Sequence, residues 1–296
     1  MFHRISGFSV CLAVAATSQP AFSSDRDTMI LEPTSHWHLD YGDTSCRIGR
    51  VFGEGETETA IYLEQVEPSE SLQWIVGGGI VAHLGSKLTT QFGPGFEPYI
   101  TRSDIGLTIS NFGDAVRGVG FEGSESNAKS DEEKPIGLPH LNLAEGDTVE
   151  WLQLSRGNRS YRLKLGNLKP VYEAMNACMV NLVTFWGSEP ELLRQRKTGP
   201  VLRNLNFVAT QIQHHYPSQA LSRGAQADLL IRAMVEADGT VSKCHVSSLT
   251  QADLFDSEAC RIMLKDAKFE PARDMQGRPM ASYAIQRVLY RMNRNR

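Results

Sequence analysis

Metal-ligating side chains alternate early in the chain, in the run His36-Trp37-His38-Leu39-Asp40. Imidazole and carboxylate groups are common zinc ligands, and some metallohydrolases use this spacing. Those sites need a further His directly after the Asp, and position 41 is Tyr. We therefore interpret the run as the beginning of a surface strand and expect no metal site. The pair His214-His215 is interpreted in a similar way, as part of a linker.

Other motifs for catalysis or cofactor binding are missing from the sequence. Neither Gly53-Glu54-Gly55 nor Gly77-Gly78-Gly79 is followed by Gly-Lys-Ser/Thr or by a strand–helix unit, so neither predicts a phosphate loop. No Gly-x-Ser-x-Gly elbow is present. The basic stretch 156–164 favours a solvated strand face over a nucleic-acid site. We expect no catalytic residue, no cofactor and no enzymatic activity.

The first 23 residues have the composition of a cleaved secretory signal. Arg4 supplies a positive end, residues 5–16 are mainly apolar, and Ala21-Phe22-Ser23 offers small residues around a cleavage site. A membrane-spanning helix needs about 20 apolar residues, and Thr17-Ser18-Gln19-Pro20 ends the run earlier. No later segment has the length and apolar character of a span. We expect export to the periplasm without an integral membrane span.

Four cysteines remain after the predicted cleavage, namely Cys46, Cys178, Cys244 and Cys260. An even number of cysteines in an exported chain favours disulfides. Four cysteines allow three connectivities, and the expected division into domains favours Cys46–Cys178 and Cys244–Cys260. Zinc binding is the alternative, but the chain has no Cys-x-x-Cys pair.

The composition is that of an ordinary globular protein with an uneven charge distribution. The 296 residues are 41% hydrophobic and 22% charged, which excludes a disordered or collagen-like chain and allows roughly two domains. Residues 24–215 hold 17 Lys and Arg against 25 Asp and Glu, whereas residues 216–296 hold 12 against 9. This difference suggests two units with different surfaces, and neither is basic enough for a nucleic-acid partner.

Residues 24–190 predict an acidic β-rich domain that ends in a helix. Apolar or alternating runs of strand length recur, and the three glycines at 77–79 are interpreted as a turn or bulge within a sheet. Apolar residues then recur every three or four positions over Leu168–Trp186, which predicts one amphipathic helix that stops at Gly187. The expected strands include Ala60–Val66, Gln73–Val76, Ile105–Ile109, Val149–Leu154 and Tyr161–Leu165.

Residues 191–213 are expected to be a linker with some helix, and residues 214–296 a second, smaller domain. In that domain Asp238-Gly239 is a strong hairpin signal. The predicted order is helix, two hairpin strands, helix and strand, which makes the whole chain α+β. The predicted ranges are Pro217–Arg223, Leu229–Glu236, Thr240–Ser247, Phe255–Ala267 and Ser282–Tyr290.

Several short motifs follow one another in this last segment: Tyr216-Pro217, Gly224, Asp238-Gly239, Ser247-Ser248, Phe269-Glu270-Pro271 and Gly277-Arg278-Pro279. Their order and spacing resemble the C-terminal domain of the TonB energy-transducer family. The resemblance implies two helices on a three-stranded antiparallel sheet, and Cys244 with Cys260 resembles a disulfide-bearing variant. Family members that use the proton gradient have an uncleaved membrane helix and a Pro-rich spacer, in place of which this chain has the predicted signal and acidic domain.

The resemblance implies a binding function, with an envelope protein or an outer-membrane receptor peptide as the partner. We expect the partner to add a strand to the exposed edge of the sheet at Ser282–Tyr290. One alternative is an enzyme or small-ligand receptor in the N-terminal domain, with the TonB-like domain as a docking appendage. The other is a disulfide-stapled envelope scaffold with no ligand of its own. The candidate partner-binding residues are Tyr216, Pro217, Tyr283, Gln286 and Arg287.

Overall fold

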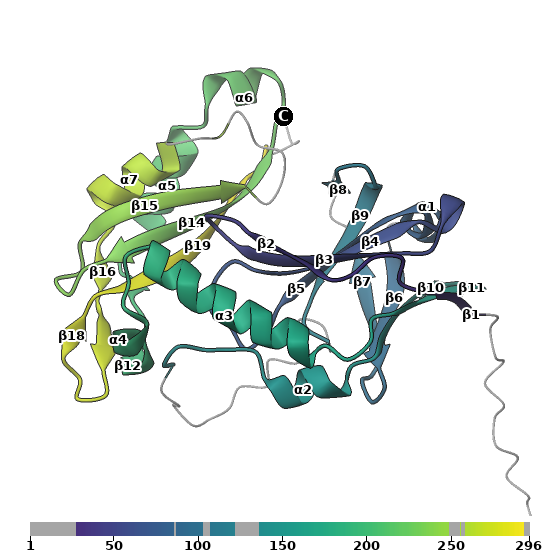
Figure 1. Ribbon diagram of the computed structural model, residues 1–296. Coiled ribbons are helices and arrows are strands. Elements are labelled where there is room, and N and C mark those ends of the chain that lie inside the picture. Colours follow the sequence, from purple (N-terminus) through teal and green to yellow (C-terminus); the bar gives the residue numbers. More distant parts are fainter. Residues whose placement is uncertain are drawn as a thin grey trace, which may run out of the picture.

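The computed structural model describes residues 28–85, 87–102, 107–121, 136–248, 255 and 258–292. The predicted signal sequence and the polar, acidic stretch 122–134 lie outside these residues. Within them the chain is α+β, as expected, and the strands and helices form the two halves seen in Figure 1. None of the helices described has the length and apolar content needed to cross a membrane.

A six-stranded antiparallel sheet forms one layer of the N-terminal half. Its strands alternate inward and outward side chains, so Ile61 and Leu63 are fully buried while Tyr62 between them is turned to the outer face. In spatial order the strands are β2 (His38–Tyr41), β3 (Cys46–Phe52), β4 (Thr59–Gln65), β5 (Gln73–Gly78), β9 (Gly113–Val119) and β8 (Thr108–Ile109).

A five-stranded sheet forms the opposite layer. The first strand of the chain pairs parallel to β11, and the other pairs in this sheet are antiparallel. In spatial order the strands are β1 (Thr28–Leu31), β11 (Arg159–Lys164), β10 (Trp151–Arg156), β6 (Lys87–Gly93) and β7 (Tyr99–Arg102).

The helix α3 (Lys169–Phe185) lies beside the two layers, together with the short α2 (Leu143–Thr148) (Figure 1). Buried residues of α3 join both sheets in one hydrophobic cluster, which explains why the helical period of this segment is clear in the sequence. The cluster includes the fully buried Trp74, Phe92 and Met175.

The interpretation of the three glycines as a turn or bulge within a sheet is wrong. Strand β5 ends at Gly78, and Gly79–Leu84 forms the helix α1. Gly78 has φ 129°, a conformation that disfavours other residues, and a Cβ on Gly79 would collide with the backbone oxygen of Glu56, in the short 3₁₀ helix Gly55–Thr57. The glycines therefore allow a strand to turn directly into a helix against a neighbouring loop.

The segment predicted as a linker packs against both halves, since Leu193 belongs to the hydrophobic cluster of the N-terminal half and Val208 and Ile212 to that of the C-terminal half. It contains α4 (Pro190–Arg194), β12 (Arg196–Thr198), β13 (Val201–Leu202) and α5 (Leu205–His214). Strand β12 pairs with β17 (Ala272–Asp274), which pairs with β18 (Pro279–Met280), and β13 pairs with β16 (Phe269–Glu270). These pairings and the burial of α5 side chains make the segment part of the packed structure.

The C-terminal sheet has three antiparallel strands in the order β15 (Val241–Ser248), β14 (Ala227–Val235) and β19 (Ser282–Tyr290). The hairpin expected at Asp238-Gly239 joins β14 to β15. The helix α7 (Glu258–Asp266) covers one face of the sheet, and α6 (Ser218–Ser222) precedes β14. The sequence predicts this helix over Phe255–Ala267, and two residues of that range, Asp256 and Ser257, lie outside the described residues.

Candidate functional site

Strand β19 lies at one edge of the C-terminal sheet. It pairs with β14 along its whole length, from Ser282 opposite Val235 to Tyr290 opposite Ala227. In the described part of the chain no strand pairs with its other side. Backbone N–H and C=O groups of an edge strand can pair with a further extended segment.

The two faces of β19 contact different hydrophobic clusters. Ala284, Val288 and Tyr290 pack in the cluster formed with α5 and α7. Tyr283 and Ile285, on the opposite face, pack in the cluster of the N-terminal half. The strand therefore connects the two halves of the protein while its edge remains at the margin of the sheet.

Tyr283, expected from the sequence to contact a partner, has its side chain buried in this structure. Only 4% of its surface is exposed, and its ring meets the ring of Trp186 edge-on at 5.5 Å between centroids. The guanidinium of Arg196 lies 5.2 Å from the Tyr283 ring centroid and donates to Ser282 Oγ at 2.9 Å. Burial raises the pKa of Tyr283 to about 12.

Tyr216 and Pro217 have structural positions rather than positions at the β19 edge. The Tyr216 hydroxyl donates to the carbonyl of Ala225 at 2.6 Å. Its ring contacts Phe255 and Tyr290 edge-on, at 5.5 and 5.2 Å between centroids. Pro217 is the N-cap residue of α6. This aromatic cluster holds the end of β19 in place, so the Tyr-Pro motif serves the fold.

Gln286 and Arg287 lie in the middle of β19, where the sequence predicts partner contacts. Arg287 is exposed and its Nε donates to Asp228 Oδ1 on β14 at 2.8 Å. The half-buried Gln286 donates its side-chain amide to the Arg287 carbonyl at 3.3 Å. Asp228 also lies 3.8 Å from Arg117 Nη2, on β9 of the N-terminal half. These contacts fix both side chains near the edge.

The segment that contains β19 matches a known domain family. Residues 212–292 match the family model of the Gram-negative bacterial TonB protein C-terminal. The resemblance expected from the sequence is therefore confirmed for this segment, which we call the TonB-like module. No curated protein matches the chain.

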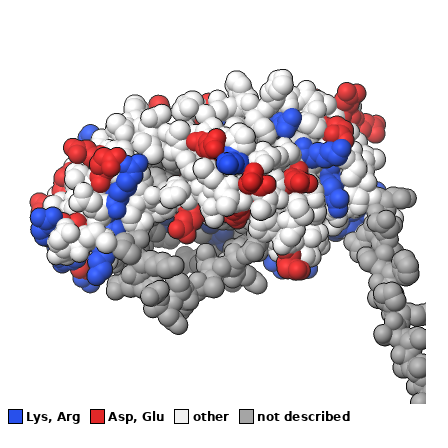
Figure 2. Space-filling model, turned by 60° about the horizontal axis from the view of Figure 1, so that its bottom comes forward, with Lys and Arg blue, Asp and Glu red and all other residues white. Residues whose placement is uncertain are grey.

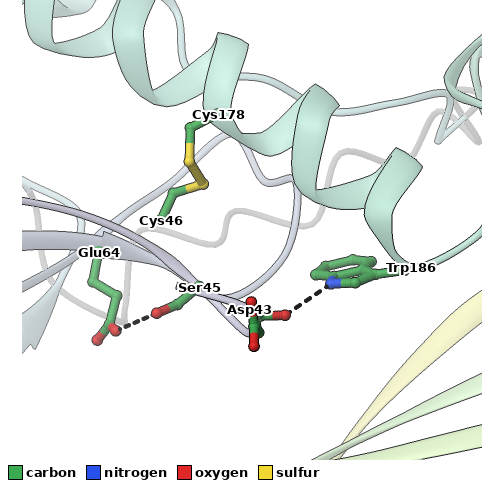
Figure 3. The surroundings of a disulfide bond; sticks show 6 residues. All are labelled: Asp43, Ser45, Cys46, Glu64, Cys178 and Trp186. Carbon is green, nitrogen blue, oxygen red and sulfur yellow. Dashed lines mark hydrogen bonds between the residues drawn. A yellow bond between two sulfur atoms is a disulfide. The ribbon is translucent and has the colours of Figure 1, made fainter. Parts of the chain in front are cut away.

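The N-terminal half covers part of the TonB-like sheet through Trp186, which the sequence did not single out. The Arg232 guanidinium of β14 lies 3.9 Å from the Trp186 ring centroid, and burial lowers the pKa of Arg232 to about 10. The Trp186 indole donates to the carbonyl of Asp43 at 3.4 Å (Figure 3). The sequence signal that could have indicated this contact is the presence of a large aromatic residue directly before the predicted helix stop at Gly187.

Both expected disulfides form. Cys46 of β3 is bonded to Cys178 of α3, with 6.1 Å between the Cα atoms (Figure 3). Cys244 of β15 is bonded to Cys260 of α7, with 5.4 Å between the Cα atoms. Each bond fastens a helix to a sheet, one in the N-terminal half and one in the TonB-like module.

The candidate metal residues are brought together only in part. His36, His38 and Asp40 line one cleft on the N-terminal half, but in the described parts of the chain no group of three or more His, Cys, Asp or Glu side chains is placed to hold a metal ion. His214 ends α5 and His215 is its C-cap residue, with Nδ1 2.8 Å from the Gln211 carbonyl. The two histidines therefore belong to a helix end.

Proposed function

We propose that the TonB-like module binds an extended segment of another envelope protein, which adds to the outer edge of β19 as a further strand. The observation that carries this proposal is the position of β19 at the end of the sheet in a segment that matches the TonB C-terminal family. The partner class is an envelope protein, with peptides of outer-membrane receptors as the first candidates. No catalytic step is part of this function.

The edge of β19 is suited to recognise a partner segment mainly through its backbone. In β-strand addition, main-chain hydrogen bonds supply affinity, and alternate side chains of the incoming segment supply specificity. Leu289 is 38% exposed on β19 and offers an apolar contact. Arg287 and Gln286 are held by contacts with Asp228 and with the backbone, so both side chains are oriented before a partner arrives.

The two disulfides support an exported location for this binding function. Disulfides persist in oxidising compartments such as the bacterial periplasm, and both pairs fasten helices to sheets that form the cores. We therefore propose that the protein is located in the periplasm, where a TonB-like module can reach proteins of the envelope.

Proline substitution at two neighbouring positions tests the proposal. Successive residues of a strand point their N–H groups to opposite sides, so one of Gln286→Pro and Arg287→Pro removes an N–H that faces β14 and the other removes one from the outer edge. The outer-edge variant should keep the melting temperature within a few degrees. It should lose at least tenfold in affinity for N-terminal peptides of outer-membrane receptors, measured by fluorescence anisotropy.

Gln286→Ala and Arg287→Ala are the matched controls, because they change the same side chains but keep both N–H groups. We expect them to bind the peptides within about threefold of the parent protein. Unchanged binding in the folded proline variant, or equal losses in the proline and alanine variants, would count against strand addition at β19.

A further inference from the structure

A cleft of about 560 Å³ lies over strands β2, β3 and β4 of the N-terminal half. None of its lining residues belongs to β19, since all of them fall between positions 35 and 62. Its size is in the range of 300–1,000 Å³ that is usual for small-molecule sites. The polar and aromatic residues that line it include Trp37, His38, Asp40, Arg47, Arg50 and Tyr62.

Small residues on the strands create the hollow. Across the sheet, His38 pairs with Gly49 and Gly49 with Tyr62, while Val51 pairs with Ala60 in the same sheet. A Cβ on Gly49 would lie 2.6 Å from a ring carbon of Tyr62, so the ring lies over the glycine. The short side chains at the floor leave the space between the larger residues open.

Arg50 is a fixed cation without an anionic partner in the described residues. Its Nε donates to the Ser35 carbonyl at 2.9 Å and its Nη1 to the Leu165 carbonyl at 3.0 Å. The guanidinium lies 5.6 Å from the Trp37 ring centroid. Within the described residues no carboxylate forms an ion pair with Arg50, and its Nη2 has no hydrogen-bond acceptor. Desolvation lowers the pKa of Arg50 from its ordinary value, but the group stays charged at neutral pH.

Three further polar side chains at the cleft have no internal contact. Over the part of the chain that the structure describes, the side chains of His36, His38 and Asp40 make no hydrogen bond or ion pair. Arg47 pairs with Glu64 at 2.8 Å, yet its Nε is buried without a hydrogen-bond partner. The cleft thus gathers unused donors and one unused carboxylate around a positively charged group.

We propose that this cleft binds a small organic anion, whose carboxylate or phosphate group is held by Arg50 and whose hydroxyl groups are bound by His38 and Asp40. A guanidinium binds planar carboxylates and phosphates through paired N–H donors. Two carbonyls already orient the Arg50 group, so little side-chain freedom is lost when an anion binds. This binding site does not depend on the TonB-like module.

The indole N–H of Trp37 reports on the cleft in ¹⁵N NMR spectra of the full protein. The four tryptophans give four indole signals, and Trp37→Phe assigns the one in the cleft. Titration with glucuronate should shift the Trp37 signal at millimolar concentration, while glucose, which lacks the carboxylate, should bind at least tenfold more weakly. Inorganic phosphate shows whether an anionic group alone suffices. A shift by phosphate as strong as that by glucuronate would overturn the assignment of the hydroxyl contacts to His38 and Asp40.

Arg50→Gln should reduce the glucuronate affinity at least tenfold. Arg162→Gln is the matched control, because Arg162 is likewise stacked on a tryptophan, at 4.1 Å from the Trp151 ring centroid, on the other sheet. His38→Ala, at an exposed position, should weaken binding about threefold and serves as the test if Arg50→Gln does not fold. The proposal would be overturned if Arg50→Gln or His38→Ala bound glucuronate as tightly as the parent protein. It would also be overturned if glucose bound as well as glucuronate, or if no anion shifted the Trp37 signal.

Discussion

At the scale of single residues, Trp186 connects the two halves of the protein. Only 5% of its surface is exposed, and its ring contacts Arg232 of β14 and Tyr283 of β19. The periodicity of the sequence places Trp186 at the end of a helix, but its role depends on contacts with residues more than forty positions away. Such long-range contacts leave no local pattern, so the sequence alone does not predict that Tyr283 is buried.

Trp186→Ala should lower the free energy of unfolding by about 3–5 kcal/mol, as is usual when a buried aromatic side chain is truncated. Phe185→Ala is the control, since Phe185 is 66% exposed one position earlier, and its change should stay within about 0.5 kcal/mol. Urea denaturation monitored by circular dichroism measures both. A loss for Trp186→Ala no larger than that of the control would contradict the importance of this contact.

His245 should make the contact between the halves sensitive to acid. Desolvation lowers the pKa of His245, the neighbouring Arg232 lowers it further, and Asp43 acts in the opposite direction. A histidine with a lowered pKa binds its proton more weakly in the folded state, so its stabilising contribution is present above the unfolded value of about 6.5 and is lost as the pH falls below it. Thermal unfolding between pH 8 and pH 5 should therefore show a smaller acid-induced loss for His245→Gln than for the parent protein. His214→Gln, at an exposed helix end, should behave like the parent.

At the scale of elements, the sequence predicts those whose pattern is local. The helical period of α3, the hairpin between β14 and β15 and the final strand β19 all follow from spacing and turn residues. The helix α1 is not predicted because it begins inside a run of glycines that usually signals a turn. The strands β12 and β13 are not predicted because they are short and depend on pairing with residues about 70 positions later.

The cleft and the β19 edge likewise have features that a local sequence pattern predicts and features that depend on contacts between distant residues. The alternation of His36, His38 and Asp40 indicates one strand face, but Arg50 and Tyr62 come from other strands, and only the sheet register brings them there. The β19 edge is predictable through the family resemblance. Which side chains on it are exposed is not, because the N-terminal half determines their burial.

The hairpin glycine Gly239 should be irreplaceable by alanine. It has φ 85°, and a Cβ there would collide with the backbone oxygen of Phe269. We expect Gly239→Ala to destabilise the protein by about 2–4 kcal/mol, from backbone strain and the collision together. Gly277→Ala separates the two causes, since Gly277 has φ 78° and a Cβ there would meet no atom within 4 Å, and it should cost about 1 kcal/mol. Equal losses in the two variants would show that the collision is unimportant.

At the scale of the whole molecule, two cores are each fastened by a disulfide and joined by the Trp186 contact. The two halves differ in composition, because acidic residues are in excess before position 216 and basic residues after it. On the face in Figure 2, basic and acidic side chains are nevertheless interspersed. That face therefore has no surface of a single charge sign. This agrees with recognition of a partner segment through backbone hydrogen bonds and local side-chain contacts.

The two disulfides should contribute unequally to stability. Chain entropy predicts about 5 kcal/mol for Cys46–Cys178, which closes a long loop, and about 3 kcal/mol for Cys244–Cys260, with sequence separations of 132 and 16. Double Cys→Ser variants of each pair, compared by urea denaturation, should show the larger loss for the first pair. A larger loss for the second pair would mean that native-state contacts, and not loop length, dominate.

The central claim is that a partner segment becomes a fourth strand beside β19, and N-methylation of the partner peptide tests it most directly. An added strand points every second N–H toward β19 and the intervening ones away. Methylating one backbone nitrogen at a time in a bound receptor peptide should reduce affinity at least tenfold at alternate positions and leave the positions between them within about twofold. Losses without this alternation, or no losses along the peptide, would contradict strand addition.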